Sequence, residues 1–85
     1  MDLFVTTEQL AALRGAKHLP DVLARVLSQS RPSGAGYLLT LTYEEATALN
    51  ELCAWNVHTD AAGAITPSSR VFEDVVTAIM NHPEY

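Results

Sequence analysis

The chain has 85 residues, 48% of them hydrophobic, and a formal net charge of −5. An acidic chain without a cluster of Lys and Arg argues against nucleic-acid binding, because basic side chains on phosphates supply most of that affinity. Its single cysteine excludes an intrachain disulfide and fits a reducing cytosol. No apolar run approaches the roughly 18 residues of a membrane span, so no membrane partner is expected.

The length predicts a single domain over residues 1–85. A domain of this size buries only about 60–70% of its unfolded surface, so disulfides, a metal or a partner chain usually add stability. The opening MDLFVTTEQ is acidic and has no basic stretch before an apolar segment. We therefore expect no secretory signal peptide and predict a cytoplasmic protein.

The first predicted elements are a short strand and a helix. Leu3 to Val5 is apolar and partly β-branched, which favours a strand. Thr6 and Gln9 have the spacing of a capping box, in which each side chain bonds a backbone N–H of the other residue. A helix is therefore expected from about Thr7 to Lys17.

A second, amphipathic helix is predicted to begin near Pro20, because proline suits the first turn of a helix. Its apolar residues recur at i, i+3, i+4, i+7 and i+8, which is the stripe of a helix that buries one face. They are Leu19, Val22, Leu23, Val26 and Leu27. The next stretch, Ser28 to Gly36, contains Pro, Gly and Ser without periodicity and is predicted to be a loop.

The same order of signals then returns. Tyr37 to Thr42 alternates leucine with threonine and predicts a strand. Thr42 and Glu45 form a second capping box, which opens a helix expected from about Tyr43 to Val57. Its predicted buried face consists of Ala46, Leu49, Cys53 and Val57, flanked by Leu52.

The last predicted elements are a loop and a fourth helix. His58 to Ile65 is the loop, and Ala64 to Thr66 is a candidate third strand. Thr66 and Pro67 have the residue types of an N-cap and a first helical residue. The helix that follows has an apolar stripe at the spacing of the second helix and ends before Pro83. The stripe consists of Phe72, Val75, Val76, Ile79 and Met80.

These elements predict an α+β fold that runs strand–helix–helix twice, with two short strands, a candidate third and about four helices. A mostly α-helical domain is the alternative. The repeated capping boxes fit an internal duplication, or two ordinary helices that each begin with a good cap. Two strands leave unpaired edges, so we expect a homodimer or higher oligomer, formed by strand pairing or by the apolar stripes of the second and fourth helices.

Few residues have the chemistry of catalysis or metal binding, and we assign neither. Cys53, His58 and Asp60 are the types of a nucleophile, a base and an acid, but Cys53 and His58 are about 140° apart around a helix. Cys53 also lies on the apolar face, which favours a core residue. The histidines, His18, His58 and His82, flank predicted helix ends, where the helix dipole accounts for them. Without clustered ligands, no metal or cofactor is expected within one chain.

Charge and exposure point to candidate binding residues. Up to Ala35 the chain has four basic and three acidic residues, and after it one basic and seven acidic. This asymmetry is either an ordinary solvated face or a dipolar surface that steers a partner. Trp55 lies off the buried face of its helix, as an interface anchor or as a residue at the edge of the core. The candidate partner-binding residues are Trp55, Tyr43, Glu44 and Glu51.

The segment YLLTLTYEEATALNELCAWNV, Tyr37 to Val57, resembles the strand, Thr-x-x-Glu cap and helix of small bacteriophage accessory proteins, especially those of high-GC hosts. It covers about a quarter of the chain. The resemblance implies a small cytosolic protein that binds a host protein or blocks a defence component. We expect a self-associating, non-enzymatic protein-interaction module, a phage-type modulator or inhibitor of a host protein. The alternative is a sponge for an anionic ligand or nucleotide, held by Arg14, Lys17 and Arg25.

Overall fold

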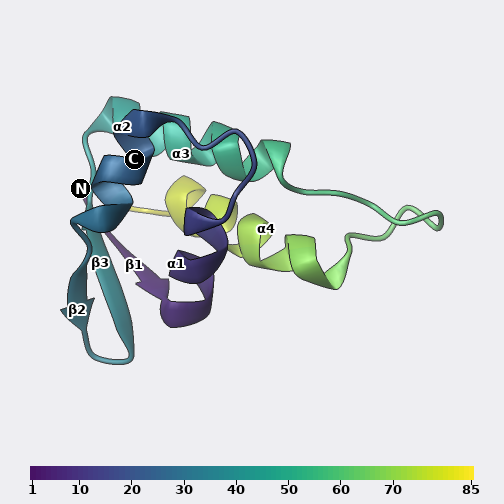
Figure 1. Cartoon of the computed structure of the whole chain (residues 1–85), viewed down its shortest axis with the longest axis horizontal. Coiled ribbons are helices and arrows are strands. Elements are labelled where there is room, and N and C mark those ends of the chain that lie inside the picture. The colour runs from purple at the N-terminus through teal and green to yellow at the C-terminus, as the bar shows by residue number, and fades with distance from the viewer.

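The computed structural model describes all residues from 1 to 85 and confirms the predicted α+β class (Figure 1). Four helices accompany one three-stranded antiparallel sheet. In chain order the elements are β1 (Asp2–Thr6), α1 (Thr7–Arg14), α2 (Asp21–Ser28), β2 (Arg31–Ser33), β3 (Gly36–Thr40), α3 (Tyr43–Trp55) and α4 (Pro67–Met80).

The sheet order is β1-β3-β2, so the strand predicted in the second half lies at the centre. β1 pairs with β3 from Asp2↔Thr40 to Thr6↔Gly36. The third strand, β2, forms a hairpin with β3 inside the stretch predicted to be a loop. The prediction of a loop was wrong there because Arg-Pro-Ser has no strand periodicity, and only its pairing with β3 makes it a strand. The candidate strand Ala64 to Thr66 contributes only an isolated bridge, Thr59↔Ile65.

Both capping boxes are confirmed. Thr6 Oγ1 accepts from the Gln9 N–H at 3.1 Å, and Gln9 Oε1 accepts from the Thr6 N–H at 2.9 Å. The second box repeats these bonds between Thr42 and Glu45 at 3.1 and 2.8 Å. α4 begins at Pro67 with Thr66 as N-cap, as predicted, although the Thr66 side chain makes no capping bond.

Two helices end earlier than predicted. α1 stops at Arg14 with Gly15 as its C-cap, instead of continuing to Lys17. α3 stops at Trp55 with Asn56 as its C-cap, instead of continuing to Val57. Because α3 ends there, Trp55 lies in its last turn, with its side chain exposed to solvent.

One hydrophobic cluster of 15 buried residues joins the sheet and all four helices. It contains the inward side chains of the strands and the predicted faces of the helices: Leu3, Val5, Leu10, Leu13, Leu23, Val26, Leu27, Leu39, Leu41, Ala46, Leu49, Leu52, Cys53, Val75 and Ile79. Val22 and Met80 were predicted to lie on buried stripes but are exposed. Each lies at the edge of its stripe, farthest around the helix from the buried residues.

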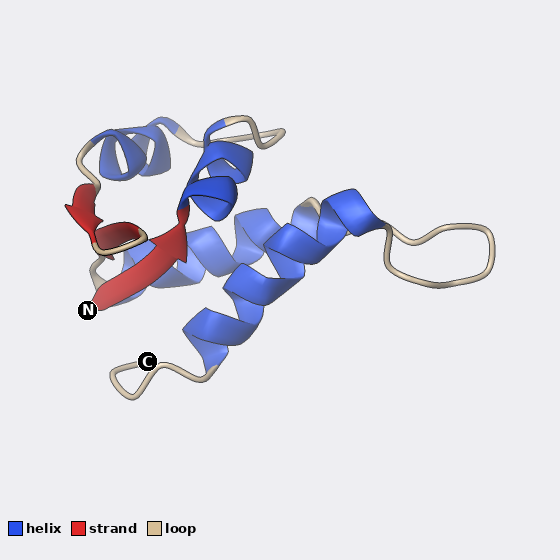
Figure 2. Ribbon diagram, turned by 90° about the horizontal axis from the view of Figure 1, so that it is seen from below, coloured by secondary structure: helices blue, strands red, loops and turns tan.

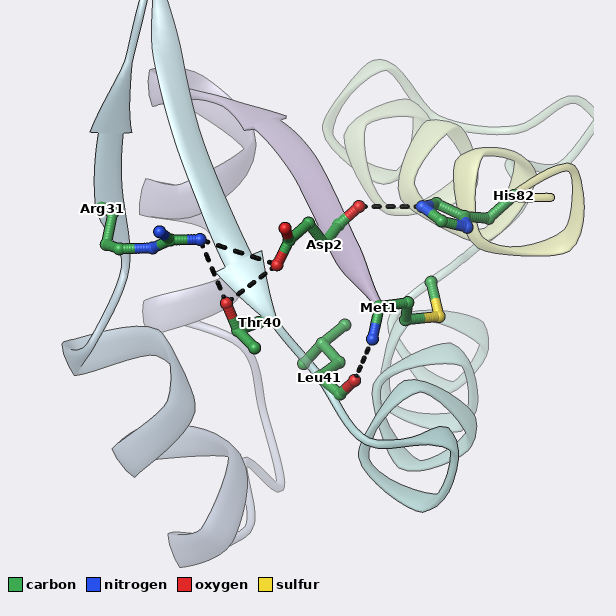
Figure 3. Close-up of polar contacts among 6 residues, drawn as sticks. All are labelled: Met1, Asp2, Arg31, Thr40, Leu41 and His82. Atoms are coloured by element: carbon green, nitrogen blue, oxygen red, sulfur yellow. Dashed lines mark hydrogen bonds and ion pairs between the residues drawn. The ribbon is translucent and has the colours of Figure 1, made fainter. Parts of the chain in front are cut away.

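A polar network crosses the sheet near the N-terminus (Figure 3). Thr40 of β3 donates to the Asp2 carboxylate at 2.9 Å, and Arg31 of β2 donates to Thr40 at 3.2 Å. His82 Nε2 lies 2.8 Å from the Asp2 carbonyl oxygen. The proline within the three-residue β2 blunts one edge of the sheet, and the His82 bond covers only the first carbonyl of β1, the strand at the other edge. Self-association through strand pairing remains a prediction.

The loop between α3 and α4 projects from the ends of these two helices (Figures 1 and 2). Its base is fixed by Ser69, a buried serine of α4. Ser69 Oγ accepts from the His58 N–H at 2.9 Å and from the Thr66 hydroxyl at 2.8 Å, and it donates to the Asn56 carbonyl at 3.3 Å. One hydroxyl thereby uses all its hydrogen-bonding capacity to join both ends of the loop.

Candidate functional site

One face of α3 brings together three of the four predicted partner-binding residues. At 100° per residue, Glu44, Glu51 and Trp55 lie within about 40° of one another around the helix. Ala48 lies between them on the same face. Trp55 is 77% exposed, the largest exposed fraction among the large hydrophobic side chains of the chain. The face is thus acidic along its length and ends in an indole.

A groove of about 370 Å³ opens beside the C-terminal half of this face. Its first wall is α3, and its second wall is the connection between α1 and α2. The lining consists of His18, Pro20, Ala48, Glu51, Leu52 and Trp55. Glu51 and Trp55 are one helical turn apart, the spacing at which two side chains on a helix are neighbours.

The two walls are joined by the side chain of Asn56. Its Oδ1 accepts from the Lys17 N–H at 3.2 Å, and its Nδ2 donates to the carbonyl oxygens of Lys17 at 3.3 Å and Leu52 at 2.9 Å. Asn56 is 7% exposed. Sequence reasoning missed this residue, because an asparagine after a helix is an ordinary C-cap.

His18 follows Lys17 directly and has a φ of +63°. It is the only non-glycine residue of the chain in the left-handed region. A histidine seldom adopts this conformation unless its surroundings hold it there. The hydrogen bonds between the Lys17 backbone and the Asn56 side chain fix the chain next to His18. The sharp turn that results places His18 and Pro20 along the groove.

Tyr43, the fourth predicted partner-binding residue, does not join the groove. It lies about 18 Å from Trp55 along the axis of α3 and about 120° around it. Its ring stacks on Tyr85, with centroids 5.1 Å apart and an angle of 17° between the planes. Tyr85 also shares a hydrogen bond of 3.0 Å with Thr47. Tyr43 therefore contacts the C-terminal residues of its own chain.

No hollow of the molecule is lined by all three basic residues of the alternative ligand site. Arg14 donates to the Leu27 carbonyl oxygen at 3.3 Å, which ties α1 to α2. It lines a shallow hollow with Leu19, Ala24, Leu27 and Ser28. Lys17 and Arg25 line none of the hollows of the molecule. No observation therefore favours the sponge over the interaction module.

Cys53, the residue with the type of a nucleophile, is not accessible to a substrate. Cys53 is fully buried, and burial raises the pKa of its thiol to about 12. Asp60 lies in the projecting loop, where its carboxylate accepts from the N–H groups of Ala62 at 2.9 Å and Ala64 at 3.1 Å. No group of three or more His, Cys, Asp or Glu residues is placed to hold a metal ion. None of the helices combines the length and apolar character needed to cross a membrane.

The buried thiol is expected to be inert in the native protein. Its pKa of about 12, against 9.0 for an exposed thiol, leaves it protonated at pH 8. Reaction with a disulfide reagent should therefore be about 100-fold slower or more than in denaturant, since the thiolate is the nucleophile. Because folding raises the pKa of the thiol, the protonated thiol contributes to the free energy of unfolding. This contribution is fully present below pH 9 and declines as the pH rises toward 12. Equal rates in buffer and in denaturant would contradict the burial of Cys53.

No protein-family model, curated protein or solved structure matches the chain. What the protein does is therefore inferred from its own residues, and the groove beside Trp55 is the feature that combines exposure, an apolar floor and charge.

Proposed function

We propose that this protein is a non-enzymatic interaction module that binds a partner protein in the groove beside Trp55. The exposure of Trp55 supports this proposal most. A tryptophan buries about 150–250 Å² when covered, so covering the exposed 77% of this one contributes about 3–5 kcal/mol at 25 cal/mol per Å². That is a large share of a micromolar affinity.

Trp55 was interpreted either as an interface anchor or as a residue at the edge of the core, and its exposed fraction favours the anchor. A residue that covers the edge of the core would lose most of its accessible surface to its neighbours. On α3 that role falls to Leu52, which is 4% exposed and forms part of the groove floor. Trp55 therefore has the character of an anchor, which inserts into a partner from the rim of an apolar hollow.

Replacing Trp55 with alanine is expected to weaken partner binding by about 30-fold or more while leaving the fold intact. Truncation of a central interface tryptophan costs about 2 kcal/mol or more. The matched control is Met80→Ala, which shortens another exposed apolar side chain, 59% exposed, on α4. Immobilised wild-type and variant proteins would be compared for capture from a bacterial lysate, followed by titration with the captured protein.

Retention of the partner by Trp55→Ala would contradict the proposal. Unfolding of that variant, seen by circular dichroism, would show that Trp55 belongs to the core. Light scattering on the same samples reports self-association, which we retain as part of the proposal. Phe4 and Val22, each 48% exposed, are apolar side chains that a second copy would cover.

The resemblance of residues 37–57 to phage accessory proteins supports a finer proposal. The partner would be a protein of a bacterial host, and this chain would modulate or inhibit it by occupying a surface that the host protein needs. The captured protein should then lose activity or a known interaction when wild-type protein is added. The Trp55→Ala variant should leave it unaffected.

A further inference from the structure

We propose that the groove binds an arginine side chain of the partner, between the indole of Trp55 and the carboxylate of Glu51. This inference rests on the proposed function and names the chemistry that the groove recognises. Both residues line the groove and come from consecutive turns of one helix face. An aromatic face attracts a cation, and a nearby carboxylate accepts hydrogen bonds from a guanidinium group.

The carboxylate of Glu51 is free to accept such a partner. The chain contains one ion pair, between Arg31 and Asp2, and Glu51 takes part in neither an ion pair nor a side-chain hydrogen bond. Its side chain is exposed at the groove. No lysine or arginine lines the groove, and the histidine that does, His18, forms no ion pair with Glu51.

The end of α3 adds to this preference. Its first turn carries Glu44 and Glu45, which suit the positive end of the helix dipole, but its last turn carries no basic residue. A cation beside Trp55 would lie near the negative end of the dipole, where cations are stabilised. The helix thus presents carboxylates along one face and an uncompensated negative end at the groove.

Arginine fits the site better than lysine. Its planar guanidinium stacks on an indole and at the same time bonds a carboxylate, whereas the strongly hydrated ammonium of lysine makes a point contact. The apolar stem of the side chain would lie on Ala48 and Leu52, which line the groove. A volume of about 370 Å³ accommodates one long side chain, while the peptide backbone remains outside.

The probe is a pair of short peptide amides, Ac-Ala-Ala-Xaa-Ala-Ala-NH₂, with arginine or citrulline as Xaa. Citrulline has the shape of arginine without its charge. Because the chain has a single tryptophan, its fluorescence reports occupancy of the groove directly. The arginine peptide is expected to bind in the millimolar range, about fivefold or more tighter than the citrulline peptide.

Glu51→Gln should abolish this preference for arginine. Glu84→Gln is the matched control, because it removes the carboxylate of an exposed glutamate that lines none of the hollows of the molecule. It should leave the preference unchanged. Added salt should weaken arginine binding to the wild type and leave citrulline binding nearly constant.

Equal binding of the two peptides, or an unchanged preference in Glu51→Gln, would overturn the arginine assignment. The absence of any binding at arginine-peptide concentrations up to about 50 mM would also overturn it. So would Trp55 emission that shifts with protein concentration alone, because that result would place a second copy of the chain in the groove. None of these results decides the proposed function, which depends separately on partner capture by Trp55→Ala. If Trp55→Ala loses the captured partner while the wild type shows no preference for arginine, the groove remains the partner-binding site. Its occupant is then a group other than an arginine side chain.

Discussion

Replacing Gly36 with alanine is expected to destabilise the protein by about 3 kcal/mol or more, because the added methyl group has no room between β3 and β1. A Cβ on Gly36 would overlap the Val5 carbonyl oxygen and would lie 2.7 Å from Cζ of Phe4. The half-exposed Phe4 ring can turn aside. The carbonyl oxygen belongs to the backbone of β1, so relief requires the paired strands to separate where Thr6 faces Gly36.

Gly15→Ala is the matched control for this change. A Cβ on Gly15 would meet only the carbonyl oxygens of Ala11 at 3.7 Å and Ala12 at 3.9 Å, and its φ of −96° suits alanine. We expect a change of no more than about 1 kcal/mol, in either direction. A loss of 3 kcal/mol lowers the melting temperature of such a domain by roughly 12 °C or more. Thermal unfolding followed by circular dichroism measures both variants, and equal midpoints would contradict the β1–β3 register.

The local parts of the fold could be predicted from the sequence. Thr6 with Gln9 and Thr42 with Glu45 identify two helix starts, because a capping box is formed by residues three apart and needs no tertiary contact. The buried faces of the helices followed from periodicity for the same reason. Helix ends were less certain, since Gly15 and Asn56 end α1 and α3 before their apolar patterns do.

Features that depend on distant parts of the chain could not be predicted. β2 consists of Arg31, Pro32 and Ser33, and it is a strand only because β3 pairs with it. Ser69 looks like an ordinary serine in the first turn of a helix, yet it is 1% exposed and joins both ends of the projecting loop. No pattern in the sequence marks a polar residue whose partners are supplied by tertiary structure.

The candidate site also contains some residues that local sequence patterns predict and others that only the tertiary structure brings there. Trp55 was expected off the buried face of its helix, because helical spacing alone places it there, and Glu51 was a candidate partner-binding residue of the same helix. Tyr43 was also a candidate, and the structure places its ring against Tyr85, outside the groove. His18 and Pro20, which form the second wall of the groove, come from a connection more than 30 residues earlier in the chain. Only the fold brings them to α3.

Asn56→Ala is the second substitution expected to have a large effect, because Asn56 holds that connection against α3. The change removes three hydrogen bonds and leaves the N–H and carbonyl of Lys17 and the carbonyl of Leu52 without these partners. Leaving partly buried backbone groups unpaired costs about 1–3 kcal/mol. We expect a loss of about 2–3 kcal/mol in the free energy of unfolding, measured by urea denaturation.

Asn81→Ala is the matched control, since Asn56 and Asn81 are both C-cap residues with φ of −98° and −97°. Asn81 is exposed, and its side chain makes no hydrogen bond within the chain, so its loss should cost no more than about 0.5 kcal/mol. The difference between the two variants isolates the contacts of the Asn56 amide from any preference for asparagine at a helix end. Similar losses in both would show that C-capping, and not the tie to Lys17, explains Asn56.

Hydrogen exchange at Lys17 separates a local effect from a general loss of stability. The Lys17 N–H donates to Asn56 Oδ1 and has no backbone acceptor. In Asn56→Ala it should exchange at least about tenfold faster under native conditions, beyond the change seen at core amides of α3. The second wall of the groove would then be free to move away from α3, and binding at Trp55 should weaken even though Trp55 and Glu51 are unchanged. Unaltered exchange at Lys17 would mean that another contact holds the wall, and that the groove does not depend on Asn56.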